Sequence, residues 1–70
     1  MSRFTIKVAR VIAGLTQEEL ADKMHVSRSA VTRWERGLSS MSGKNLQTFC
    51  EVTGFKAEDI ILPSESTKEG

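Results

Sequence analysis

Three glycines divide this chain of 70 residues into short segments: Gly14, Gly37 and Gly54 each follow a stretch of helical periodicity. Helices commonly end at glycine, because glycine adopts the left-handed backbone conformation with little strain. The periodicity predicts four helices, at residues 4–15, 17–24, 28–36 and 45–53, and a short fifth helix before Pro63, at residues 57–62. The expected fold is therefore all-α, a compact bundle of about five short helices.

Each predicted helix has one face that is suited to burial. The first segment is ambiguous, because Phe4, Ile6 and Val8 also alternate with polar residues as in a strand, but its length favours a helix. The residues on these faces are Phe4, Val8, Val11, Ile12 and Leu15 in the first helix, Leu20, Ala21 and Met24 in the second, Ala30, Val31 and Trp34 in the third, Leu46, Phe49, Cys50, Val52 and Thr53 in the fourth, and Ile60, Ile61 and Leu62 in the fifth.

The starts of the second and third helices carry clear signals. The stretch "TQEE", which begins at Thr16, has the spacing of a capping box, in which the Thr16 hydroxyl and the Glu19 carboxylate each bond the other residue's amide. Ser27 is a favourable N-cap for the third helix. Only two residues lie between Met24 and Ser27, so a very short turn joins the two helices. This arrangement is typical of a helix-turn-helix.

Length and composition exclude several classes of protein. A single domain is expected at residues 1–63, followed by a polar tail at residues 64–70 that is predicted to be disordered. No apolar run approaches the roughly 18 residues of a membrane-spanning helix. Cys50 is the only cysteine, which excludes a disulfide framework and fits a reducing, cytoplasmic setting. Because no catalytic set, glycine-rich phosphate loop or metal cluster is apparent, we expect neither enzyme activity nor a cofactor.

The charge is unevenly distributed, although the net charge is only +1. Residues 1–37 contain seven lysines and arginines against four acidic residues, and residues 38–70 contain three against five. A basic half beside an acidic half is a mild indication of one anionic partner on one face. From the residues alone, Arg28 and Arg33 fit a solvated helix face as well as an anion-binding one.

Three other residues have simple structural interpretations. Trp34 is expected in the core, His25 in the turn, and Cys50 as a small buried hydrophobic residue. Met41, in the loop after the third helix, is expected either to need no function or to be an exposed partner contact.

The stretch "LTQEELADKMHVSRSAVTRWERG", residues 15–37, resembles the helix-turn-helix of the phage repressor and Cro family, the XRE-type or lambda-repressor-like domains. The resemblance continues through "LQTFCEVTGFKAEDII" and covers about residues 6–62. The matching positions are residues 14–17, 19–21 and 26–27, with Val31, Trp34, Glu35 and Gly37. Two positions depart from the family pattern. His25 stands where a glycine is common in the turn, and Thr53 stands where an aliphatic residue usually precedes the glycine that closes the fourth helix.

The resemblance implies a set of DNA contacts. The third helix would enter the major groove and read base edges. Gln17 and the start of the second helix would face a phosphate. Arg10 and Glu35 match positions that form a structural pair in the family. The implied base contacts are Arg28, Ser29, Thr32 and Arg33, and the implied phosphate contacts are Gln17, Ser27, Arg36, Ser39, Ser40, Ser42, Lys44 and Asn45; for Arg36 the helix dipole is an equally good explanation.

The function implied by the resemblance is that of a Cro-like repressor of phage or mobile-element origin. It would bind a double-stranded DNA operator as a homodimer, with two third helices in successive major grooves. Two alternatives remain open. One is a protein-interaction module, an antirepressor or antitoxin that uses the same fold to bind a repressor or toxin. The other is a DNA-binding protein that also pairs with a second, heterologous repressor.

Overall fold

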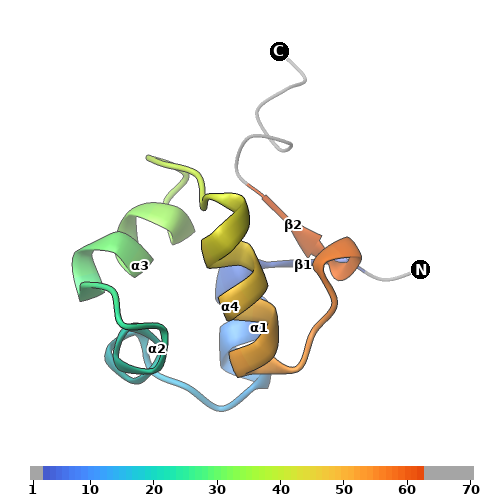
Figure 1. Ribbon diagram of the computed structural model, residues 1–70, viewed down its shortest axis with the longest axis horizontal. Helices are drawn as coiled ribbons and strands as arrows, with labels where there is room; N and C mark the ends of the chain where they lie inside the picture. The colour runs from blue at the N-terminus through green and yellow to red at the C-terminus, as the bar shows by residue number, and fades with distance from the viewer. Residues whose placement is uncertain (1–2, 63–70) are drawn as a thin grey trace.

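The computed structural model describes residues 3–62, which form four α-helices, a 3-10 helix and a two-stranded sheet (Figure 1). Helices α2 and α3 lie on one side of α1 and α4, and the small sheet lies on the other. The tail predicted at residues 64–70 lies outside the described residues. The elements are β1 (Phe4–Thr5), α1 (Ile6–Ile12), α2 (Gln17–Met24), α3 (Arg28–Glu35), α4 (Gly43–Thr53), the 3-10 helix η1 (Ala57–Asp59) and β2 (Ile60–Ile61).

The all-α prediction is confirmed, but the predicted fifth helix is wrong. Residues 57–59 form a 3-10 turn, and Ile60 and Ile61 continue as an extended strand. An α-helix of six residues gains too few hydrogen bonds to offset its nucleation cost. Two consecutive β-branched residues favour extended backbone instead.

Residues 4 and 5 were predicted to be helical, and they are a strand. β1 pairs with β2 in parallel, with Phe4 opposite Ile60. The Phe4 ring also meets the Phe55 ring edge-on, with centroids 5.1 Å apart. Thr5 then caps α1, because its hydroxyl accepts a hydrogen bond from the Val8 amide. The pairing joins the two ends of the described chain, so the alternation in the first residues was the better signal there.

The buried face of α1 also differs from the sequence prediction. Ile6 and Ala9 point into the core, whereas Val8, Val11 and Ile12 are 43%, 57% and 58% exposed. Apolar residues occur at helical spacing on both faces of this short helix, so the spacing alone does not decide which face is buried. The buried face is set by contacts with β2 and α3, which a single sequence does not reveal.

The other helices bury the faces that were predicted. Outside α1, the buried core residues are Leu20, Ala21, Met24, Val31, Trp34, Met41, Phe49 and Ile60. Met41 is therefore a core residue and not an exposed partner contact. Cys50 packs against this cluster and is half-buried, and burial raises the pKa of its thiol, with smaller contributions from Asp59 and Glu51.

The predicted start signals of α2 and α3 are present. The Thr16 hydroxyl accepts from the Glu19 amide at 3.0 Å, and Glu19 accepts from the Thr16 amide at 2.9 Å. Ser27 accepts from the Ala30 amide at 3.1 Å. Between the helices, His25 has φ 59° and ψ 42°, the left-handed conformation that glycine adopts readily and that explains why glycine is common at this position of the resembling family. These local interactions set where α2 begins and ends and where α3 begins.

We expect His25→Gly to stabilise the protein by roughly 0.5–1 kcal/mol, which raises Tm by about 2–8 °C. Glycine adopts positive φ without the steric cost that a Cβ carries, and the His25 side chain is exposed. Thermal unfolding followed by circular dichroism measures the change. His25→Ala is the matched control and should lower Tm. A Tm that falls in both variants would mean that the imidazole itself makes a stabilising contact.

Candidate nucleic-acid interface

One face of α3 is anchored in the core and the opposite face is open. Val31 is fully buried and Trp34 is 5% exposed, so together they fix the rotation of the helix. Because helical residues repeat every 3.6 positions, the polar positions at the start of the helix and one turn later project outward. These outward residues are Arg28, Ser29, Thr32 and Arg33, of which Thr32 is half-buried and the other three are exposed.

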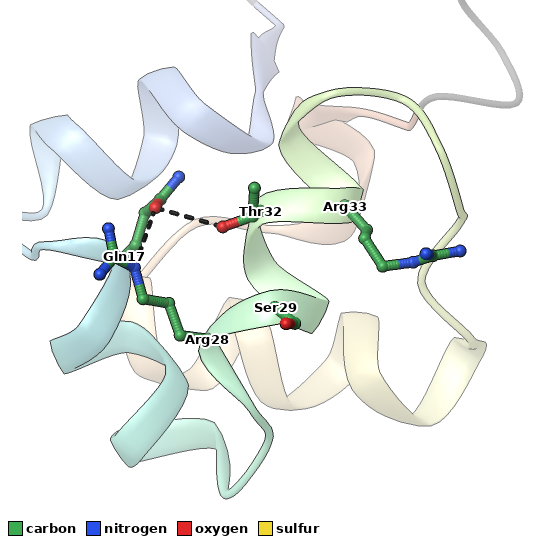
Figure 2. A pocket seen from close by; sticks show the side chains of 5 residues that line it. All are labelled: Gln17, Arg28, Ser29, Thr32 and Arg33. Carbon is green, nitrogen blue, oxygen red and sulfur yellow. Dashed lines mark hydrogen bonds between the residues drawn. The ribbon is translucent and has the colours of Figure 1, made fainter.

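The outward residues of α3 and Gln17 line an open depression of about 500 Å³ (Figure 2). Gln17 is the first residue of α2, so the depression lies where the two helices meet. All four predicted base contacts and one predicted phosphate contact are therefore brought together. The lining contains two arginines and no acidic residue, which gives it the charge and the hydrogen-bond donors to receive an anion.

Gln17 is the centre of a hydrogen-bond network within this depression. Its side-chain oxygen accepts from Arg28 Nε at 3.4 Å and from the Thr32 hydroxyl at 3.3 Å (Figure 2). Its side-chain nitrogen donates to Glu35 Oε1 at 2.9 Å. The network therefore connects the first turn of α2 to both ends of α3.

Behind Gln17, the predicted pair of Arg10 and Glu35 is present as an ion pair. Arg10 Nε lies 2.6 Å from Glu35 Oε2, and Arg10 Nη2 donates to Glu35 Oε1 at 3.2 Å. Arg10 Nη1 donates to the backbone oxygen of Leu15 at 2.8 Å. The two side chains are only 10% and 4% exposed, so solvent screens the pair weakly. The pair ties α1 to the end of α3 and holds α3 in place.

Sequence reasoning missed the hydrogen bond between Gln17 and Glu35. The two residues are 18 positions apart, and neither belongs to a pattern that specifies the other. Gln17 was interpreted as a phosphate contact and Glu35 as a partner of Arg10 only. No signal in a single sequence links them, because their meeting depends on the angle between α2 and α3.

The other predicted phosphate contacts do not line the depression. Ser27 and Ser42 serve as N-caps of α3 and α4, and Arg36 is the C-terminal cap residue of α3. Ser39 and Ser40 follow in the loop, half-buried and exposed respectively. Lys44 and Asn45 were predicted at the junction of a loop and a helix beginning at Asn45. They lie in the first turn of α4, which begins at Gly43 because Ser42 accepts from the Asn45 amide.

Within residues 3–62 no group of His, Cys, Asp and Glu side chains is arranged to hold a metal ion. In the same part of the chain, none of the helices has the length and apolar character needed to cross a membrane.

Two comparisons with known proteins bear on this site. A protein-family model described as helix-turn-helix matches residues 6–60, which include the depression and the network behind it. A protein named as an uncharacterized HTH-type transcriptional regulator, from Methanocaldococcus jannaschii, is 37% identical over 57 residues. Those residues are 81% of this chain and 86% of that protein.

Proposed function

Because this chain belongs to the helix-turn-helix family, we propose that it is a Cro-like repressor that binds a double-stranded DNA operator with α3 in the major groove. The family assignment supports the coarser function, that of a DNA-binding transcriptional regulator. The observation that carries the proposal is the depression in which Gln17 and the outward residues of α3 come together. A cationic, acid-free surface on an anchored helix suits the phosphates and base edges of a duplex.

The proposed contacts follow from the chemistry of each side chain. Arg28 and Arg33 would bond guanine O6 and N7, the commonest specific contact of arginine in the major groove. Thr32 and Ser29 would meet neighbouring base edges. The remaining residues would position the protein by bonding phosphates, which fixes orientation without reading sequence. That group is Gln17, Ser27, Arg36, Ser39, Ser40, Ser42, Lys44 and Asn45.

We propose that the protein acts as a homodimer in the cytoplasm. A dimer places two α3 helices in successive major grooves, about 34 Å apart, so the operator would be an inverted repeat. Occupying such a site at a promoter would repress transcription. Pairing with a second, heterologous repressor would produce an operator with two different half-sites.

The alternative function, a protein-interaction module, is favoured by one observation. Val8, Val11 and Ile12 form an exposed apolar stripe on α1, and Leu38 is also 60% exposed. Exposed apolar patches are common where one protein binds another. An antirepressor or antitoxin would use such a surface, and its affinity for DNA would be weak.

A selection from a random duplex library at physiological salt tests the proposal. An enriched inverted repeat with half-sites about one helical turn apart would support a dimeric operator-binding protein. The affinity for the enriched duplex should fall steeply as salt rises, because phosphate contacts release counterions. A folded protein that enriches no sequence would contradict the proposal and favour the protein-interaction alternative.

We expect Arg28→Ala to cost about 1–3 kcal/mol of binding free energy on the enriched duplex and to relax the preference at one base pair. Arg36→Ala is the matched control, since Arg36 lies outside the depression at the end of α3. It should weaken binding to all duplexes equally and reduce the salt slope by about one. Fluorescence anisotropy with single-base variants of the duplex measures both. An equal loss on every sequence for Arg28→Ala would make Arg28 a phosphate contact.

A further inference from the structure

The orientation of the Gln17 side-chain amide is determined by its partners. A carboxylate only accepts hydrogen bonds, so the amide nitrogen must face Glu35. An arginine side chain only donates, so the amide oxygen must face Arg28. Glu35 and Arg28 are therefore consistent with the same orientation of the Gln17 amide. Glu35 is in turn held by Arg10, and its position therefore turns the Gln17 oxygen to Arg28 and Thr32. The amide nitrogen carries two hydrogens, so one remains to bond a phosphate.

This orientation leaves Arg28 with a defined set of free donors. Its Nε–H is donated to Gln17, whereas its two terminal nitrogens bond no residue in the described part of the chain. Two terminal nitrogens side by side form the fork that matches O6 and N7 of a guanine. Arg28 is thus restrained at the base of its guanidinium and open at the tip.

Thr32 and Arg33 differ from Arg28 in instructive ways. Thr32 donates its hydroxyl hydrogen to the same Gln17 oxygen, so the hydroxyl is left as an acceptor. The Arg33 side chain extends away from Gln17 and Arg28 and forms no hydrogen bond within residues 3–62 (Figure 2). Ordering a free arginine on binding costs more conformational entropy than using one that is already restrained. The network therefore preorganises Arg28 and leaves Arg33 unrestrained.

We propose that Glu35 is a positioning residue for base readout, which acts through Gln17 to hold Arg28 with its terminal nitrogens directed at a guanine of the operator half-site. The proposal rests on the proposed function, DNA binding by α3. It separates the two arginines: Arg28 determines the preference for one guanine, and Arg33 contributes less to sequence preference. Glu35 itself would not touch DNA, since its side chain is only 4% exposed.

A pair of double variants tests this role without leaving Arg10 as an unpaired buried charge. Arg10→Met with Glu35→Leu removes the ion pair and the acceptor for Gln17. Arg10→Met with Glu35→Gln removes the same charges but keeps a side-chain oxygen that accepts from Gln17. Gln17→Ala is a third variant, which leaves the ion pair intact and removes the link to Arg28. Thermal unfolding establishes which variants are folded before binding is measured.

The readout is the affinity for the duplex enriched from the random library, with each guanine replaced in turn by 7-deazaguanine, which lacks the N7 acceptor. For the wild-type protein we expect one guanine at which the replacement weakens binding by roughly tenfold, because it removes N7, one of the two acceptors of a bidentate contact. The Leu double variant and Gln17→Ala should lose most of that sensitivity, and the Gln double variant should recover part of it. A purely structural role for Glu35 would leave the sensitivity unchanged in both double variants, whatever the result for Gln17→Ala.

The possible failures are distinguishable. If the wild-type protein enriches no duplex, the proposed function and this inference both fail. If it enriches a duplex in which no guanine depends on Arg28, or if Gln17→Ala keeps the full sensitivity, the inference is wrong while the proposed function stands. If neither double variant folds, Gln17→Ala tests the link between Gln17 and Arg28, through which Glu35 must act, and full sensitivity in that variant would overturn the inference.

Discussion

Phe49→Ala is expected to leave a large fraction of the molecules unfolded at room temperature. Phe49 is fully buried and is the largest such side chain in the described residues. Replacing a buried phenylalanine by alanine costs about 3–5 kcal/mol, through lost burial and the cavity that remains. A core of this size rarely supplies more than about 3–5 kcal/mol in total. The expected loss is therefore as large as the whole stability.

The position of Phe49 explains why neighbouring residues are not expected to fill the cavity. It lies on α4, which packs against α2 and the 3-10 helix η1. Both neighbours are held by their own constraints, α2 by its capping box and η1 by the strand pairing that follows it. A cavity with fixed walls collapses little, which puts the cost near the upper end of the range.

Urea unfolding followed by Trp34 fluorescence measures the effect. Phe49→Leu is the matched control, because it keeps an apolar side chain of similar size and should retain a cooperative transition with a lower midpoint. A Phe49→Ala protein with a midpoint close to that of Phe49→Leu would show that the helices close around the smaller side chain. It would then follow that α4 is less firmly held than its contacts indicate.

Local signals in the sequence were sufficient for the helices that form the site. Thr16 and Ser27 carry their capping partners within three residues, so the starts of α2 and α3 were predicted from neighbouring positions alone. The left-handed conformation of His25 was implied by the resemblance, because a glycine is common at that position of the turn. The burial of Val31 and Trp34 then follows from helical periodicity, and with it the outward face of α3.

The features that were not predicted depend on distant parts of the chain. β1 and β2 are two residues each and pair across more than fifty positions, so neither has a local pattern long enough to specify it. The prediction of which face of α1 is buried was wrong for a related reason. Its exposed valines and isoleucine are as apolar as its buried face, and only packing against α3 and β2 decides between the two.

The candidate site was predictable as a set of residues but not as a network. The resemblance to a repressor family supplied the residues, and the structure brings five of them into one depression. The resemblance gave no indication that Gln17 bonds Glu35, since that contact depends on the angle between α2 and α3. Side chains that were interpreted separately, as a DNA contact and as a structural pair, are parts of one arrangement.

Glu35→Ala tests the strength of that arrangement and should destabilise the fold by about 3–5 kcal/mol. The loss would come less from the attraction within the pair than from Arg10, whose side chain is only 10% exposed and would remain as a buried charge without its partner. Gln17 would lose the acceptor of its side-chain nitrogen as well.

The matched comparison is the double variant Arg10→Met with Glu35→Leu, in which no charge is left behind. Replacing a buried ion pair by apolar side chains of similar volume is often neutral or stabilising, so the double variant should be more stable than Glu35→Ala. Urea unfolding of the single and double variants gives the coupling energy between the two positions. A loss below about 1 kcal/mol for Glu35→Ala is what an exposed pair gives, and it would mean that water reaches Arg10 in solution. Glu35 would then be too weakly held to orient Gln17, and Arg28 would approach DNA without a restraint from α2.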